Sequence, residues 1–136
     1  MKKWMGIVGV VMILSLALVA CGGSSGGSSS GGATIKTTMT DFKFDPAEWT
    51  VNAGQQVTLD LTNNGSTEHS WALMSKPISG SFTDADKPNV LFSKVVPAGQ
   101  SATATFTAPT TPGDYQVVCD IPGHFEAGMV GKLTVK

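Results

Sequence analysis

Alternating apolar and polar residues, separated by turn sequences, run from residue 33 to the end of the chain. In Val57–Thr62 and Ala102–Thr107 every second side chain is apolar, which is the period of a half-buried β-strand. Shorter stretches of this kind predict further strands at residues 34–39, 49–51, 69–74, 115–119 and 129–135. Gly, Pro and Asn mark the turns between them, and no amphipathic helix of ordinary length is seen. The pattern therefore predicts an all-β sandwich or barrel.

Residues 76–93 are the exception to this pattern. They contain two prolines and a glycine and show no clear period. We expect a long loop there, or a short helical insert.

The first twenty residues have the layout of an export signal. Lys2 and Lys3 give a positive start, and the stretch from residue 5 to residue 20 is almost wholly apolar. This stretch is short for a membrane-spanning helix, which needs about 20 apolar residues, although an uncleaved anchor is the alternative. Leu18-Val-Ala-Cys21 resembles the lipobox of bacterial lipoproteins. That resemblance implies that Cys21 becomes the first residue of the mature chain and carries a lipid.

Residues 22–32 consist only of Gly and Ser, so they bury no apolar surface and are expected to form a flexible tether. The predicted organisation is a signal peptide at 1–20, a lipidated Cys with its linker at 21–32, and one folded domain at 33–136. The domain is then exported and lipid-anchored, on the outer face of the cell membrane or in the periplasm.

The charge of the chain argues against nucleic acid as a partner. All nine basic residues are Lys, and removal of Lys2 and Lys3 with the signal leaves seven of them against ten acidic residues, a net charge of −3. A nucleic-acid-binding protein needs a basic patch that replaces counterions. With two Cys and two His in the whole chain, a disulfide framework and a zinc finger are also excluded.

His69, Cys119, His124 and Met129 are the candidate metal ligands. The last three follow one another as Cys-x4-His-x4-Met in the segment between the last two predicted strands. His69 lies fifty residues before Cys119, at the start of a different strand. A two-sheet fold can bring such a segment against the end of a distant strand. Each residue alone could be an ordinary core or surface residue, but the domain's only Cys and both its His belong to this set.

Two imidazoles and a thiolate with a weak thioether form the ligand set of a blue-copper site. Thiolate and thioether are soft ligands that suit Cu(I), and imidazole suits both Cu(I) and Cu(II). Zinc also binds Cys and His but has no use for the thioether, and hard cations prefer oxygen. One copper ion is therefore the predicted cofactor.

The chain resembles the cupredoxins, the type 1 blue copper proteins, and among them the auracyanins most closely, with azurin-like and plastocyanin-like motifs. The resemblance covers nearly all of residues 34–136. It is carried by Phe42-Lys-Phe-Asp-Pro46, by Glu68-His-Ser-Trp71, and by the stretch from Gly113 to Val135 that contains Cys119-Asp-Ile-Pro-Gly-His124. It implies an eight-stranded Greek-key β-sandwich.

The resemblance also implies a role for each site residue. His69, Cys119 and His124 become the equatorial ligands and Met129 the axial one, and the carbonyl of Glu68 is a candidate for a weak contact on the opposite side. Ser70 stands where azurin and auracyanin have an Asn that hydrogen-bonds to the Cys loop. In these families the edge of the second His lies in an apolar patch where redox partners dock. The corresponding residues here are Pro122, Gly123, Phe125, Ala127 and Gly128, next to Ile121.

The predicted function is one-electron transfer by a membrane-tethered monomer that is not an enzyme. The extra Cys or His residues that a binuclear site or a multicopper enzyme needs are absent. By resemblance to auracyanin, the electron donor is a quinol-oxidising complex. The acceptor is then a c-type cytochrome, a reaction centre or a terminal oxidase. The main alternative is a copper-binding lipoprotein for storage, delivery or resistance, and a third is a metal-free adhesion domain.

Overall fold

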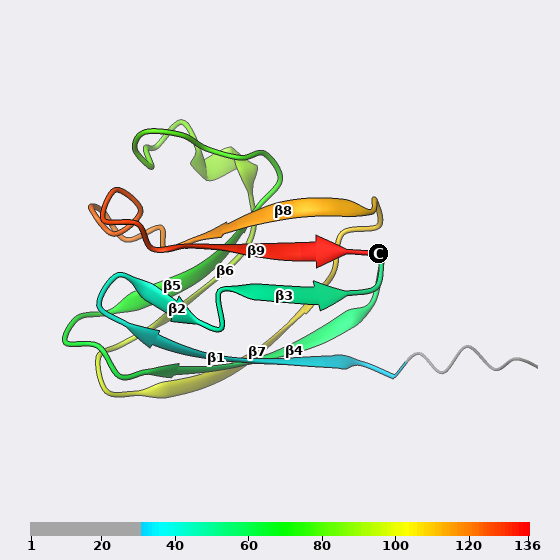
Figure 1. The fold of residues 1–136 in the computed structure, drawn as a ribbon, viewed down its shortest axis with the longest axis horizontal. Helices are drawn as coiled ribbons and strands as arrows, with labels where there is room; N and C mark the ends of the chain where they lie inside the picture. The colour runs from blue at the N-terminus through cyan, green and yellow to red at the C-terminus, as the bar shows by residue number, and fades with distance from the viewer. Residues whose placement is uncertain (1–30) are drawn as a thin grey trace, which may run out of the picture.

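The computed structural model describes residues 31–136, which form two β-sheets packed face to face (Figure 1). The predicted signal, Cys21 and most of the linker lie outside these residues. The first sheet has the strand order β2-β1-β4-β7 and consists of β1 (Ala33–Thr40), β2 (Lys43–Asp45), β4 (Gln56–Asn63) and β7 (Ser101–Thr107). The second has the order β3-β9-β8-β5-β6 and consists of β3 (Glu48–Val51), β5 (His69–Met74), β6 (Val90–Val96), β8 (Gly113–Val118) and β9 (Val130–Val135).

The all-β sandwich predicted from the sequence is confirmed, but with nine strands instead of eight. The strands that the periodicity did not reveal are β2 and β6. Strand β2 has only three residues, too few to show a period. In β6 apolar side chains point to both faces, and Leu91 and Val95 remain exposed because β6 is an edge strand paired only with β5.

The predicted loop at residues 76–93 is therefore too long by four residues, because β6 begins at Val90. The short helical insert is present as the 3₁₀ helix η1 (Lys87–Asn89), with Pro88 at its start. It is the only helix among residues 31–136, and none of the described residues belongs to a helix that could cross a membrane.

The main core lies between the two sheets. Alternation on β4 buries Val57, Leu59 and Leu61, and their partners from the second sheet include Trp71 and Leu133. Each aliphatic side chain buried in this way contributes about 1.5–3 kcal/mol to the stability of the fold. This core fixes the relative position of the two sheets and therefore of the strand ends that carry the site.

Strand β5 is buried on both faces, and all six of its residues are inaccessible. One face belongs to the main core. On the other face Ala72 and Met74 pack with Val118 and Phe125 in a second apolar cluster, which Ile78 and Phe82 of the long loop help to cover. His69 is the first residue of β5, so its backbone belongs to a strand that is packed on both faces.

Three segments meet at the end of the sandwich that lies opposite the C-terminus (Figure 1). They are the turn between β1 and β2, the turn between β4 and β5, and the loop between β8 and β9. The segments belong to both sheets, so the packing of the sheets decides which of their side chains meet.

Candidate metal centre

The loop between β8 and β9 is closed by its own backbone. Cys119 N–H donates to the Met129 carbonyl at 3.1 Å, and Met129 N–H donates to the His124 carbonyl at 3.0 Å. Gly123 and Gly128 take left-handed φ angles of 84° and 95°, which residues with a side chain rarely adopt. These turns fold the stretch from Cys119 to Met129 back on itself and direct His124 toward Cys119.

The structure brings His69, Cys119 and His124 together. All three are buried, and one donor atom from each lies within 4.8 Å of the others. Nδ1 of His69 is 3.1 Å from Nδ1 of His124, and the latter is 3.3 Å from Sγ of Cys119. Both imidazoles thus present the same nitrogen to the thiol, and each has Nε2 left for other contacts.

Met129 is fully buried and packs in the main core. Its backbone bonds to both Cys119 and His124, so it is part of the same closed loop. Glu68 directly precedes His69 in the turn and is exposed. The axial role of the Met129 thioether and the weak contact of the Glu68 carbonyl stay predictions.

Ser70 lies against the thiol. Its backbone N–H donates to Sγ of Cys119 at 3.3 Å, and its Oγ lies 3.6 Å from the same sulfur. The hydroxyl also donates to the carboxylate of Asp120 and accepts a hydrogen bond of 2.8 Å from the Asp120 N–H. Ser70 thus connects β5 to the Cys119 loop.

Asp41 holds His69 from the other side, and the sequence analysis missed it. Its Oδ1 lies 3.2 Å from Nε2 of His69. Ser66 fixes the carboxylate, with its N–H 2.9 Å from Oδ1 and its Oγ 2.7 Å from Oδ2. A carboxylate on the second ring nitrogen orients a metal-binding His and fixes its tautomer. No local signal marks Asp41, because only the fold places the β1–β2 turn beside His69.

Gly65 covers the contact between Asp41 and His69. A Cβ atom at this position would lie 2.6 Å from Oδ1 of Asp41 and 2.6 Å from Nε2 of His69. The buried Asn63 side chain holds the turn in place, because its amide donates to the carbonyls of Thr67 and Val96 and its Oδ1 accepts from Gly65 N–H. Only glycine therefore fits at position 65, because any side chain would collide with Asp41 and His69.

The surface around His124 differs in part from the predicted docking patch. Pro122, Gly123, Ala127 and Gly128 are exposed. Phe125 is only 8% exposed and packs in the second apolar cluster, so its placement in the patch is corrected: the turn at Gly123 directs its ring onto the sheet.

Phe42, which the sequence analysis did not include in that patch, does lie beside His124. It is 45% exposed, and its ring meets the His124 ring edge to face at 5.1 Å. Its φ of 66° is unusual for a bulky residue, and strained backbone of this kind clusters at functional sites.

Burial sets the protonation of the site in the metal-free protein. Desolvation raises the pKa of Cys119, and hydrogen bonds from Ser70 oppose this. Desolvation also lowers the pKa of His124, with a further contribution from the charge of His69. Thiolate is the form that binds metal, so metal binding at Cys119 releases a proton.

The donor set fits copper. It combines a thiol with two imidazole nitrogens, all three inaccessible to solvent or nearly so, and no carboxylate is among the three converging residues. Soft sulfur with imidazole selects copper or zinc over hard cations.

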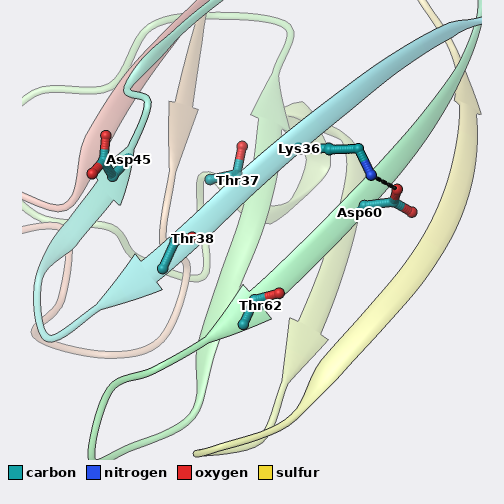
Figure 2. A pocket seen from close by; sticks show the side chains of 6 residues that line it. All are labelled: Lys36, Thr37, Thr38, Asp45, Asp60 and Thr62. Carbon is teal, nitrogen blue, oxygen red and sulfur yellow. Dashed lines mark hydrogen bonds and ion pairs between the residues drawn. The ribbon is translucent and has the colours of Figure 1, made fainter.

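Figure 2 shows a different hollow, on the first sheet, lined by the polar side chains of Lys36, Thr37, Thr38, Asp45, Asp60 and Thr62, with Lys36 paired to Asp60 at 3.1 Å. None of the predicted site residues lines it.

A two-sheet β-sandwich that gathers His, Cys and His at one end is the arrangement of a cupredoxin. Residues 32–136 match the family of copper-binding proteins described as the plastocyanin/azurin family. The chain belongs to this family, whose members bind copper, and the predictions of a cupredoxin and of one copper ion as cofactor are confirmed.

Relatives with known names include two kinds of copper protein. Auracyanin-A of Chloroflexus aurantiacus is 33% identical over an alignment that covers 96% of each chain. The copper-resistant cuproprotein CopI of Rubrivivax gelatinosus is 32% identical over 84% of this chain and 73% of its own. The crystal structure of dithionite-reduced auracyanin from the photosynthetic bacterium Roseiflexus castenholzii superposes with a TM-score of 0.64 at 30% identity, covering 77% of this chain and 99% of that one.

Proposed function

We propose that this protein is a one-electron carrier that holds copper with His69, Cys119 and His124, and with Met129 as an axial ligand. The observation that supports this most directly is the convergence of three buried donor atoms within 4.8 Å of one another. Copper in such a site supplies a Cu(II)/Cu(I) couple. The proposed role is that of a carrier rather than an enzyme.

The residues around the site keep its ligands in one arrangement. Asp41 bonds the outer nitrogen of His69, Ser70 N–H bonds the sulfur, and the backbone of Met129 bonds that of both Cys119 and His124. A ligand set that is fixed before metal binds changes little between two oxidation states. The nearly complete burial of the three donors also excludes water.

Electrons would enter and leave at the surface around His124. We propose that Phe42, Pro122, Gly123, Ala127 and Gly128 form the docking patch, since all are exposed in the segments that carry or contact His124. A small apolar patch suits a weak encounter that exchanges quickly, as in redox complexes that bury less than about 1,200 Å².

The proposed location and partners follow from the sequence. An exported domain anchored through a lipid on Cys21, either on the outer face of the cell membrane or in the periplasm, could meet membrane redox complexes. We propose a quinol-oxidising complex as donor, and a c-type cytochrome, a reaction centre or a terminal oxidase as acceptor. The similarity to auracyanin supports this, since two of the solved auracyanins come from photosynthetic bacteria.

Copper resistance is the second candidate, favoured by the similarity to the copper-resistant cuproprotein CopI. A protein that passes copper on would present exchangeable Met or His side chains at its surface. Among residues 31–136, Met39 and Met74 are 0% and 1% exposed and both belong to apolar clusters. Their burial supports the carrier.

The test is the visible spectrum of the purified protein with Cu(II), before and after ascorbate. An intense blue band that reductant bleaches and oxidant restores is the expected result, and it should be absent in Cys119→Ser. Copper binding with a pale spectrum or none would overturn the carrier and favour storage or resistance. Partner docking is tested by the rate of electron transfer to a c-type cytochrome.

A further inference from the structure

Asp120, the residue after Cys119, is fixed beside the thiol by two other strands. The hydroxyl of Ser70 on β5 donates to its Oδ1, and the hydroxyl of Ser93 on β6 donates to its Oδ2 at 3.0 Å. The N–H of Asp120 donates to Oγ of Ser70 at 2.8 Å. The half-buried carboxylate therefore has a defined position next to the site.

The Ser70 hydroxyl has two possible acceptors but only one hydrogen to donate. Sγ of Cys119 lies 3.6 Å from Oγ, and the carboxylate oxygen of Asp120 lies much nearer. A carboxylate accepts hydrogen bonds more strongly than sulfur does, so the hydrogen goes to Asp120. The sulfur then keeps the Ser70 backbone N–H, at 3.3 Å, but not the hydroxyl.

The charge of Asp120 is not cancelled by a direct ion pair. Among residues 31–136, the salt bridges of Lys and His side chains involve other carboxylates. Lys87 lies near enough to be influenced by Asp120, but its Nζ is bonded to Oδ1 of Asp84 at 2.7 Å. A net negative charge thus remains one residue from the thiol.

We propose that Asp120 is a positioning residue that lowers the reduction potential of the site. It draws the Ser70 hydroxyl away from Sγ of Cys119. It also places a negative charge beside the site, and this charge favours Cu(II) over Cu(I). The inference rests on the proposed function, because it requires a copper couple at these ligands.

Two substitutions of Asp120 separate the two effects. Asp120→Asn removes the charge but keeps an oxygen that the Ser70 hydroxyl can reach, whereas Asp120→Ala removes both and frees the hydroxyl for Sγ. In a Ser70→Ala background the difference between the two variants should vanish. Asp114→Asn is the matched control, because Asp114 lies near the start of β8, at the end of the strand away from Asp120, and its carboxylate is bonded to Thr134 at 2.7 Å.

The measured quantity is the equilibrium preference for Cu(I) over Cu(II), obtained by redox titration of the full-length protein. We expect Asp120→Asn to raise this preference about tenfold and Asp120→Ala to raise it further, whereas Asp114→Asn stays within about twofold. The thiolate-to-copper absorption band should also move to higher energy in Asp120→Ala, because the sulfur gains a hydrogen bond. If Asp120 served only to link β5 and β6 to the loop, its substitution would not raise the preference for Cu(I) more in Asp120→Ala than in Asp120→Asn.

Folding is checked by thermal unfolding of the metal-free proteins. If Asp120→Ala does not fold, Ser93→Ala replaces it: this variant keeps the Asp120 charge and removes a hydrogen bond that partly offsets it, so a small shift toward Cu(II) is expected. If the wild type shows a reversible copper couple and the Asp120 variants show the same preference for Cu(I), or a shift toward Cu(II), the inference about Asp120 is overturned and the proposed function is not. A wild type without a blue band or a reversible couple overturns the proposed function and this inference with it.

Discussion

The two segments that carry the proposed copper ligands are built in different ways. Cys119, His124 and Met129 lie in one loop whose own backbone hydrogen bonds close it. His69 starts a strand that is buried on both faces, and its ring is held by Asp41 from a separate turn. The loop is therefore a local structure, whereas the position of His69 depends on the packing of the whole sandwich. Substitutions can test the two segments separately.

The largest effect is expected from removing the packing beneath His69. Trp71, two residues along β5, is fully buried and meets the Trp49 ring edge to face at 5.5 Å. Trp71→Ala should cost about 3–5 kcal/mol of unfolding free energy, because it deletes a large side chain from the core. Denaturant unfolding measures this. Trp71→Phe keeps most of the ring and should cost clearly less, and equal costs would contradict the packing argument.

Gly65→Ala should break the His69 side of the site without touching the loop. The added Cβ would clash with both Asp41 and His69, so copper affinity should fall by about 10–100-fold. The comparison is Gly123→Ala on the loop side, where a Cβ meets nothing within 4 Å and only the left-handed φ is unfavourable, by about 1 kcal/mol. Competition titrations of copper give both affinities. A greater loss in Gly123→Ala would show that the loop is the more sensitive segment.

Asp41→Ala removes the hydrogen bond to His69 but leaves the backbone in place. We expect a loss of copper affinity of about tenfold, at the lower end of what such supporting bonds contribute, and a broader thiolate-to-copper band because the imidazole is less fixed. Asp45→Asn is the control, since it removes an exposed carboxylate from the same hairpin that does not contact the site. An unchanged affinity in Asp41→Ala would mean that packing alone orients His69.

The smallest effect on the site itself is expected from Phe42→Ala. Phe42 covers part of the His124 ring but makes no hydrogen bond to a ligand, so the blue band and its reversibility should persist. The rate of electron transfer to a protein partner should fall several-fold if the exposed ring belongs to the docking patch. Leu91→Ala removes an exposed apolar side chain from β6 and should leave the rate unchanged. Equal rates for all three proteins would argue against a role of Phe42 in docking.

Much of this architecture could be read from local patterns. The alternation in Val57–Thr62 gave β4 nearly to the residue, and that in Ala102–Thr107 gave β7 to within one residue. Strand β6 was not predicted, because an edge strand need not bury one face and therefore need not show an alternating pattern. Its Leu91 and Val95 are exposed. Phe125 was misplaced on the surface because the resemblance placed the residues around His124 in an exposed patch, and only the path of the loop shows that its ring packs on the sheet.

The sequence by itself determined the kind of chemistry, because Cys119, His124 and Met129 are spaced within one loop and the only other His is His69. The tertiary structure decided which groups support those ligands. Asp41, Gly65 and Asp120 carry no periodicity or spacing that marks them, and their partners His69 and Ser70 lie four to fifty residues away. Local patterns report which face of a strand is buried, whereas contacts between turns depend on how the two sheets pack.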